Sequence, residues 1–203
     1  MIISGILSLM TTGPIKIFYL YKKAIFPHCT INIRMRRSRH SVNIKTGDRI
    51  IVCSLRSMAD ILFLRRRISV LSEITDASPD GRHIKFQLKG IKRVRINNVR
   101  MFHDGECEEI HESSPQQDPL LTKELRKKAQ ELIFLINVNE SDKLIELMNF
   151  LVDLGQISDF IANYFVLEYR MRIELLNETD VNKRSRLLLE KIQQIIDKIK
   201  NRG

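Results

Sequence analysis

The sequence predicts an α+β protein in which a small β-barrel or curved sheet is followed by a C-terminal helical bundle. Apolar and polar residues alternate along much of residues 15–112, as in strands, whereas apolar residues recur every three or four positions in residues 120–203, as in helices. Residues 113–119 are polar and contain two prolines, so we expect a linker there. Residues 1–14 are expected to be a disordered leader.

The β half contains about six short strand-like runs. Residues 15–22 are mostly apolar and fit a buried strand, while residues 30–36 alternate strictly and fit a half-buried one. The Asp80-Gly81 pair predicts a hairpin turn within residues 78–81, because such turns require residues that tolerate positive φ. Gly90 predicts a break or bulge in the strand that follows. The predicted strands cover residues 15–22, 30–36, 49–53, 68–74 and 83–88, with a further one around 94–96.

The helical half contains four or five short helices with apolar stripes. The second of these is expected to be capped by Asn139 or Ser141 and to stop at Gly155, and the third to begin at Ser158. Thr179 or Asp180 caps the last helix. The predicted helices cover residues 120–136, 141–154, 158–165, 168–176 and 181–199. Packed together, they form a compact bundle.

The excess positive charge lies entirely in the β half. The chain carries a net charge of +10; residues 1–115 hold 20 Lys+Arg against 10 Asp+Glu, and residues 116–203 hold 14 of each. A basic face would bind an anionic partner such as RNA through phosphate contacts, unless it is simply solvated. Aromatic residues make up only 6%, and Trp is absent, which counts against base stacking. The candidate patch for an anionic partner comprises Arg34, Arg36, Arg37, Arg39, Arg65, Arg66, Arg67, Lys92, Arg93 and Arg95.

The sequence contains no recognisable catalytic or cofactor motif. None of the eight glycines is followed by Lys and then Ser or Thr, as a phosphate-binding loop requires. Cys107 and His111 have the spacing of helical zinc ligands but no matching second pair, which favours a solvated acidic strand or loop. His28 and Cys29 are adjacent, so on a strand they would point to opposite faces, and a structural role is favoured. We therefore expect no catalytic residue, metal or cofactor.

Cysteine usage and hydropathy bear on localisation. The three cysteines are odd in number and widely spaced, which favours a reducing compartment and hence the cytoplasm. No apolar run reaches the roughly 18 residues that a membrane span needs. Residues 1–14 lack a basic start and so do not resemble a secretory signal.

Four short segments, taken in order, resemble the N-terminal domain of Lon proteases. Phe26-Pro27 follows an apolar strand and leads into the next one, as in that family. Asp80-Gly81 and the Gly90-x-x-Arg93-x-Arg segment resemble its hairpin and the strand after it. Val181-Asn182, before a basic pair, resembles the start of its last helix. The sequence departs from the family at Tyr19, Asn32 and Ile68, and residues 38–48 are too short for a helix that many members carry.

The resemblance implies a PUA-like β structure followed by a helical bundle, and a role in recognising protein substrates. Family members carry ATP hydrolysis and peptide cleavage, the latter by a Ser–Lys pair, in separate downstream domains, and neither motif set is found here. The resemblance therefore implies a stand-alone, non-catalytic module that binds unfolded or tagged polypeptides, with a link to ATP-dependent proteolysis.

Two alternative partners are thus expected. One is a polypeptide, which the resemblance implies, and the other is RNA, which would bind the basic β half. Polypeptide binding would use aromatic side chains as anchors. The alternative for each aromatic residue is a place in the core. Oligomeric state is left open. The aromatic candidates are Phe63, Phe86, Phe102, Tyr164 and Phe165.

Overall fold

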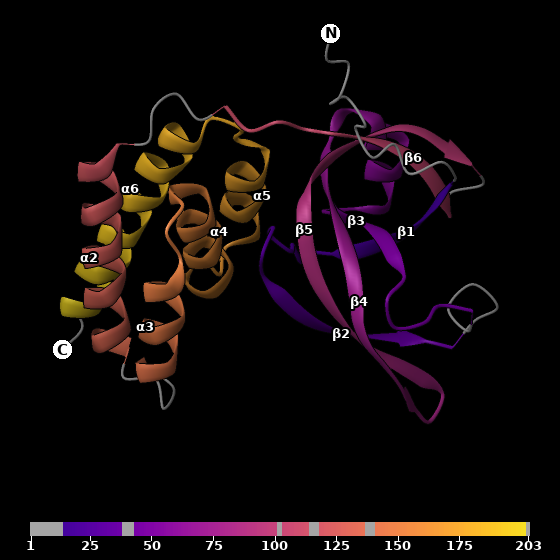
Figure 1. Cartoon of the computed structure of the whole chain (residues 1–203), viewed down its shortest axis with the longest axis horizontal. Helices are drawn as coiled ribbons and strands as arrows, with labels where there is room; N and C mark the ends of the chain where they lie inside the picture. Colours follow the sequence, from indigo (N-terminus) through magenta and orange to yellow (C-terminus); the bar gives the residue numbers. More distant parts are fainter. Residues whose placement is uncertain (1–13, 38–42, 101–102, 114–117, 137–140, 202–203) are drawn as a thin grey trace, which may run out of the picture.

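The computed structural model describes residues 14–37, 43–100, 103–113, 118–136 and 141–201, without the side chains of Arg65, Arg66 and Ser141. The leader expected before residue 14, the patch residue Arg39, the aromatic Phe102 and the alternative cap Asn139 lie outside this part of the chain. So does most of the expected linker. The described residues form a β part and a helical part that lie side by side, and the helices nearest the sheet are α4 (Leu154–Phe165) and α5 (Tyr169–Asn177) (Figure 1).

The β part is one mixed sheet that closes on itself. Its order is β2-β5-β4-β3-β1-β6, and an additional pairing between β5 and β6 joins five of the strands into a ring. β1 and β3 are parallel, whereas the other pairs are antiparallel. β2 pairs with β5 outside the ring. The strands are β1 (Ile15–Tyr21), β2 (Thr30–Arg36), β3 (Arg49–Leu55), β4 (Ile68–Asp80), β5 (His83–Arg100) and β6 (Asp104–Glu109).

The hairpin between β4 and β5 is longer than the sequence pattern predicts. β4 continues through the expected turn to Asp80, so that only Gly81 and Arg82 separate the strands. Gly81 has φ +58°, the left-handed conformation that such a turn requires. Pro79 is tolerated in β4 because β3 pairs with β4 only up to Glu73, which leaves this stretch of β4 at an open edge.

Gly90 lies within one continuous strand. β5 runs through Gly90, and its register against β4 shifts between Leu71 and Ser72, so the residue marks a bulge and not a strand end. The glycine is required by close packing: a Cβ at position 90 would clash with the carbonyl oxygen of Phe26. The backbones of Gly90 and of the segment after Phe26 are hydrogen-bonded, with His28 N donating to Gly90 O at 2.8 Å.

The helical part follows the predicted apolar stripes, with one correction at a boundary. Asp153 caps α4 by accepting a hydrogen bond from Gln156 N, so α4 begins four residues before Ser158 and Gly155 lies in its first turn. The prediction that Gly155 ends the preceding helix is therefore wrong. Asp180 caps the last helix as predicted, accepting from Lys183 N. The helices are α2 (Pro119–Ile136), α3 (Ser141–Phe150), α4 (Leu154–Phe165), α5 (Tyr169–Asn177) and α6 (Val181–Lys200).

Sequence periodicity did not predict a short 3-10 helix, η1 (Met58–Arg66), between β3 and β4. Its Leu64 is buried with Ile15, Ile17 and other strand residues in a core cluster that belongs to the β part alone. A second, larger cluster continues from the sheet into α2, α4 and α6. The fold class predicted from the sequence, α+β with a barrel before a helical bundle, is confirmed.

Candidate functional site

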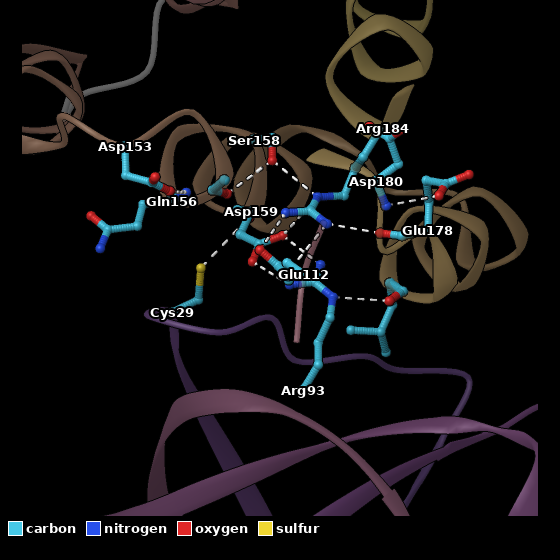
Figure 2. A network of polar contacts seen from close by, with 12 residues as sticks. Cys29, Arg93, Glu112, Asp153, Gln156, Ser158, Asp159, Glu178, Asp180 and Arg184 are labelled. Atoms are coloured by element: carbon cyan, nitrogen blue, oxygen red, sulfur yellow. Dashed lines mark hydrogen bonds and ion pairs between the residues drawn. The ribbon is translucent and has the colours of Figure 1, made fainter. Parts of the chain in front are cut away.

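A buried network of charged groups joins the β part to the helical part. Arg93 of β5 donates two hydrogen bonds of 2.7 Å to the carboxylate of Asp159 on α4. Its Nε donates to the carbonyl oxygen of Leu176 at the end of α5, at 3.0 Å. It also pairs with Glu112, which follows β6, at 2.5 Å. Figure 2 shows Arg93, Glu112 and Asp159 close together at this junction.

A second arginine completes the network from α6. Arg184 Nη2 donates to Glu112 at 3.2 Å, and its Nε donates to Ser158 Oγ at 3.1 Å. It also donates to the carbonyl oxygen of Glu178 at 2.8 Å. Two guanidinium groups therefore face two carboxylates, and one network links the sheet to α4, α5 and α6 (Figure 2).

Arg93 is a structural residue, which corrects the sequence prediction for this position. It is only 2% exposed, so it cannot contribute to an exposed patch for an anionic partner. Burial alone lowers the pKa of its guanidinium, but the nearby carboxylates of Asp159 and Glu112 raise it, and the net shift is upward. Its charge is therefore already matched inside the protein.

A sequence signal for this network exists at Asp159. It lies in α4 among Ile157, Phe160 and Ile161, and a lone carboxylate on such an apolar helix needs a buried cation. The adjacent Ser158 strengthens the signal, because it too is fully buried. The helix pattern therefore indicates a buried polar site, although it does not identify the partner arginines.

The remaining family-motif residues lie around the same junction or at the hairpin. Phe26 and Pro27 are buried where their backbone packs against Gly90. Val181 is buried at the start of α6, and its backbone N–H donates to the carbonyl of Ser113 at 3.2 Å. Asp80 and Gly81 form the hairpin end, far along β5 from Arg93. Asn182 lies in the first turn of α6.

A polar cleft of about 230 Å³ opens beside the network. Pro27, His28, His111 and the first turn of α4 line it, together with Glu112. Its strongest charges are already paired inside the network, so the described geometry assigns it no ligand. The spacing of Cys107 and His111 does not create a metal site: the described residues contain no group of three His, Cys, Asp or Glu side chains placed to hold a metal ion.

The predicted basic patch divides into two parts. At one end of β5 the cations face acidic residues of β6: Lys92 pairs with Glu109, Arg95 with Glu108 at 3.6 Å, and Arg100 with Glu106 at 2.7 Å. Arg67 pairs with Asp60 at 2.7 Å.

Arg34, Arg36 and Arg37 lie elsewhere, at the end of β2 beside the hairpin turn. The structure therefore does not bring the predicted residues together on one face. The side chains of Arg65 and Arg66, like Arg39, are outside the described part of the chain.

The aromatic candidates also separate. Phe86 and Phe165 are buried in the core. Phe63 and Tyr164 are exposed, at 55% and 41%. Phe63 belongs to η1, and this helix also exposes Met58 and Leu62, at 72% and 76%. Three of the nine residues of this helix thus present large apolar side chains to solvent, while Leu64 is buried in the core.

Local hydrogen bonds hold η1 in place. The Asp60 carboxylate accepts from the backbone N–H of Arg56 at 2.6 Å and of Ser57 at 3.1 Å, and from Arg67 Nη2 at 2.7 Å. Burial raises the pKa of Asp60, but these hydrogen bonds and the charge of Arg67 outweigh it, so the pKa lies below its usual value. Asn177 of α5 accepts from Ile68 N at 3.4 Å, which places the end of α5 beside the start of β4, just after η1.

None of the helices in the described residues combines the length and the hydropathy needed to cross a membrane.

Fold and junction together define a class of α+β domain in which a closed sheet and a helical bundle are joined by buried ion pairs. Residues 14–194 match the family model of the ATP-dependent protease La (LON) substrate-binding domain, and the chain belongs to this family. No curated protein matches its sequence.

Solved structures of the same kind share the fold. The N-terminal domain of the Mycobacterium avium complex Lon protease is 13% identical, with a TM-score of 0.66, over 89% of this chain and 98% of that one. The Lon N-terminal domain protein from Xanthomonas campestris is 19% identical, with a TM-score of 0.61, over 88% of this chain and 98% of that one.

Proposed function

We propose that this chain is a non-catalytic module that recognises unfolded or tagged polypeptides in association with ATP-dependent proteolysis. The observation that carries the proposal is the group of exposed apolar side chains on η1: Met58, Leu62 and Phe63. Membership of a substrate-binding family supports a role in substrate recognition. Unfolded chains expose apolar side chains that folded proteins bury, so a fixed apolar surface discriminates between the two.

The geometry favours η1 over other exposed apolar residues. Leu64 and the hydrogen bonds to Asp60 fix the helix, so little conformational entropy is lost when a polypeptide binds to it. Leu167, 88% exposed, lies between α4 and α5, and the far end of α5 contacts the start of β4, just after η1, through Asn177. A polypeptide bound to η1 can therefore extend toward the helical part.

The test is binding of a fluorescently labelled, carboxymethylated model protein that cannot fold. The double variant Leu62→Ser, Phe63→Ser is expected to weaken binding by about thirtyfold, since each of the two lost apolar anchors contributes on the order of 1 kcal/mol. Phe150→Ser, Val152→Ser is the matched control: these residues are similarly exposed, at 74% and 81%, but lie at the end of α3.

Equal affinity of the η1 variant and the unmodified protein would contradict this assignment, as would an equal loss in both variants. ATP hydrolysis or peptide cleavage by the pure protein would contradict the non-catalytic role.

RNA binding by the β half remains the alternative, and the charges weaken it. Lys92, Arg95 and Arg100 each have a carboxylate partner on β6. Their positive charges are therefore less available to bind RNA phosphates than their number suggests.

A further inference from the structure

One end of the sheet extends beyond the ring as a three-stranded tip, formed by β2, the first half of β5 and the last half of β4. β3 accompanies β4 only to Glu73, so the tip has a strand order of β2-β5-β4. Arg34 lies opposite Lys85, and Arg36 opposite His83, which in turn lies opposite Asp80. Residues directly opposite one another share a face of the sheet, so one face of the tip is basic.

The tip and its turn carry an excess of positive charge. Residues 30–37 and 74–91, which make up the tip and its turn, contain two carboxylates, Asp76 and Asp80, against six cations: Arg34, Arg36, Arg37, Arg82, Lys85 and Lys89. The carboxylate of Asp80 forms ion pairs with both Arg34, at 2.7 Å, and Lys85, at 3.8 Å. At the other end of β5, by contrast, each cation has its own carboxylate on β6.

The tip also has an open strand edge. Within the part of the chain that the structure describes, β2 has a neighbouring strand on one side only. Its residues Thr30, Asn32 and Arg34 are exposed. The opposite edge of the tip, on β4, contains Pro79, which lacks an N–H donor, whereas β2 contains no proline. Of the two edges, β2 is therefore the one that can accept another strand.

We propose that the edge of β2 binds an extended acidic polypeptide segment as an added β-strand. Edge N–H and C=O groups supply the backbone hydrogen bonds, and alternate acidic side chains, roughly 6.6 Å apart along a strand, match the spacing of Arg34 and Arg36. The proposal rests on the proposed function only in that the partner is a polypeptide. It uses a surface separate from η1.

Charge and composition favour this occupant over two others. A second copy of the chain would pair through its own β2, which contains no carboxylate to match Arg34 and Arg36. RNA needs stacking surfaces for its bases, but the one aromatic residue of the tip strands, Phe86, is buried.

The experiment measures anisotropy of a labelled peptide of alternating glutamate and valine. The unmodified protein is expected to bind it and to reject the matching lysine–valine peptide. Arg34→Glu should weaken binding by about fivefold. Arg100→Glu is the matched control, because Arg100 is as exposed as Arg34, at 59% against 58%, and is also paired at 2.7 Å, but lies away from the tip. Asp80→Asn should strengthen binding, since it removes the competing carboxylate.

Hydrogen exchange distinguishes strand addition from simple charge attraction. The bound peptide should slow amide exchange in β2, and an N-methylated peptide of the same charge should bind more weakly. Unchanged peptide affinity in Arg34→Glu, binding without protection of β2, or tighter binding of a single-stranded RNA of equal charge would each overturn the proposal. The η1 double variant should retain peptide binding, so a loss confined to either surface identifies which of the two proposals fails.

Discussion

An arginine that is almost completely buried needs its charge matched, and Arg93 meets this condition through Asp159 and Glu112. Removing one partner of a buried pair leaves the other charge unmatched, which costs more than the pair itself contributes. Arg93→Met should therefore lower the free energy of unfolding by about 3–5 kcal/mol. Urea denaturation of the variant and the unmodified protein measures this difference in unfolding free energy.

The control for Arg93 is its exposed neighbour on the same strand. Arg95 pairs with Glu108 at 3.6 Å and is about half exposed, so Arg95→Met should change the unfolding free energy by less than about 1 kcal/mol. Similar losses in both variants would show that the buried network does not stabilise the junction. Adding Asp159→Leu to Arg93→Met should recover part of the loss, because it removes the unmatched carboxylate.

Gly90 is constrained by a backbone atom that cannot move aside easily. A methyl group there would clash with the carbonyl oxygen of Phe26, so Gly90→Ala should destabilise the protein by about 2 kcal/mol or more. Gly81→Asn is the comparison: position 81 has φ +58° and open space around it, and asparagine tolerates that conformation. Thermal unfolding should show a clear drop in Tm only for Gly90→Ala; equal drops would disprove the close-packing explanation.

At the scale of elements, the stability of η1 depends on Asp60. Asp60→Asn keeps the side-chain size but loses the charged acceptor of three hydrogen bonds. Amide exchange in η1 should accelerate, and affinity for an unfolded polypeptide should fall, with little change in global stability. Because the pKa of Asp60 is lowered in the folded protein, its contribution is present above the usual value of 3.8 and is lost as the pH falls below it. Unchanged exchange in η1, in the variant or in acid, would contradict this role.

The elements differ in how far the sequence predicts them. The strands β1 to β3 and the helices α2 and α6 follow clear apolar periods and turn or cap residues. η1 was missed because 3-10 turns have no long apolar period, and its outward side chains are as apolar as its inward ones. The start of α4 was misplaced because Gly155 is a typical helix stop, whereas here the lack of a side chain lets Glu112 and Arg184 approach.

At the scale of the whole molecule, the two halves share one core. The larger apolar cluster contains residues of both, and the Arg93 network crosses between them. Unfolding should therefore be a single transition, with fluorescence of a dye on β4 and helical circular dichroism giving the same midpoint. The fragment 15–112 should be much less stable than the full chain, since Arg93 loses Asp159 and Phe26 loses its cover. Two separate midpoints, or a stable fragment, would show two independent domains.

The sequence predicts the total charge of the β half but not how its charged residues pair. Counting assigns the excess to the β half, but pairing depends on which strands become neighbours. The acidic strand β6 lies beside one end of β5 and neutralises Lys92 and Arg95, while Arg34 lies at the other end. Arg93 was assigned to the wrong environment because it lies among other basic residues in the sequence, and only the position of α4 reveals that its side chain is covered.

The pairing of β2 with β5 has a mechanical consequence. Seven residues of β2 pair in antiparallel register with β5, which continues as one strand to Arg93 and the buried network. Interstrand hydrogen bonds lie perpendicular to the strands, so a pull along a segment added to β2 would load the whole ladder in shear instead of opening it one bond at a time. A segment bound there would resist tension along its length far better than a pull that peels it from one end.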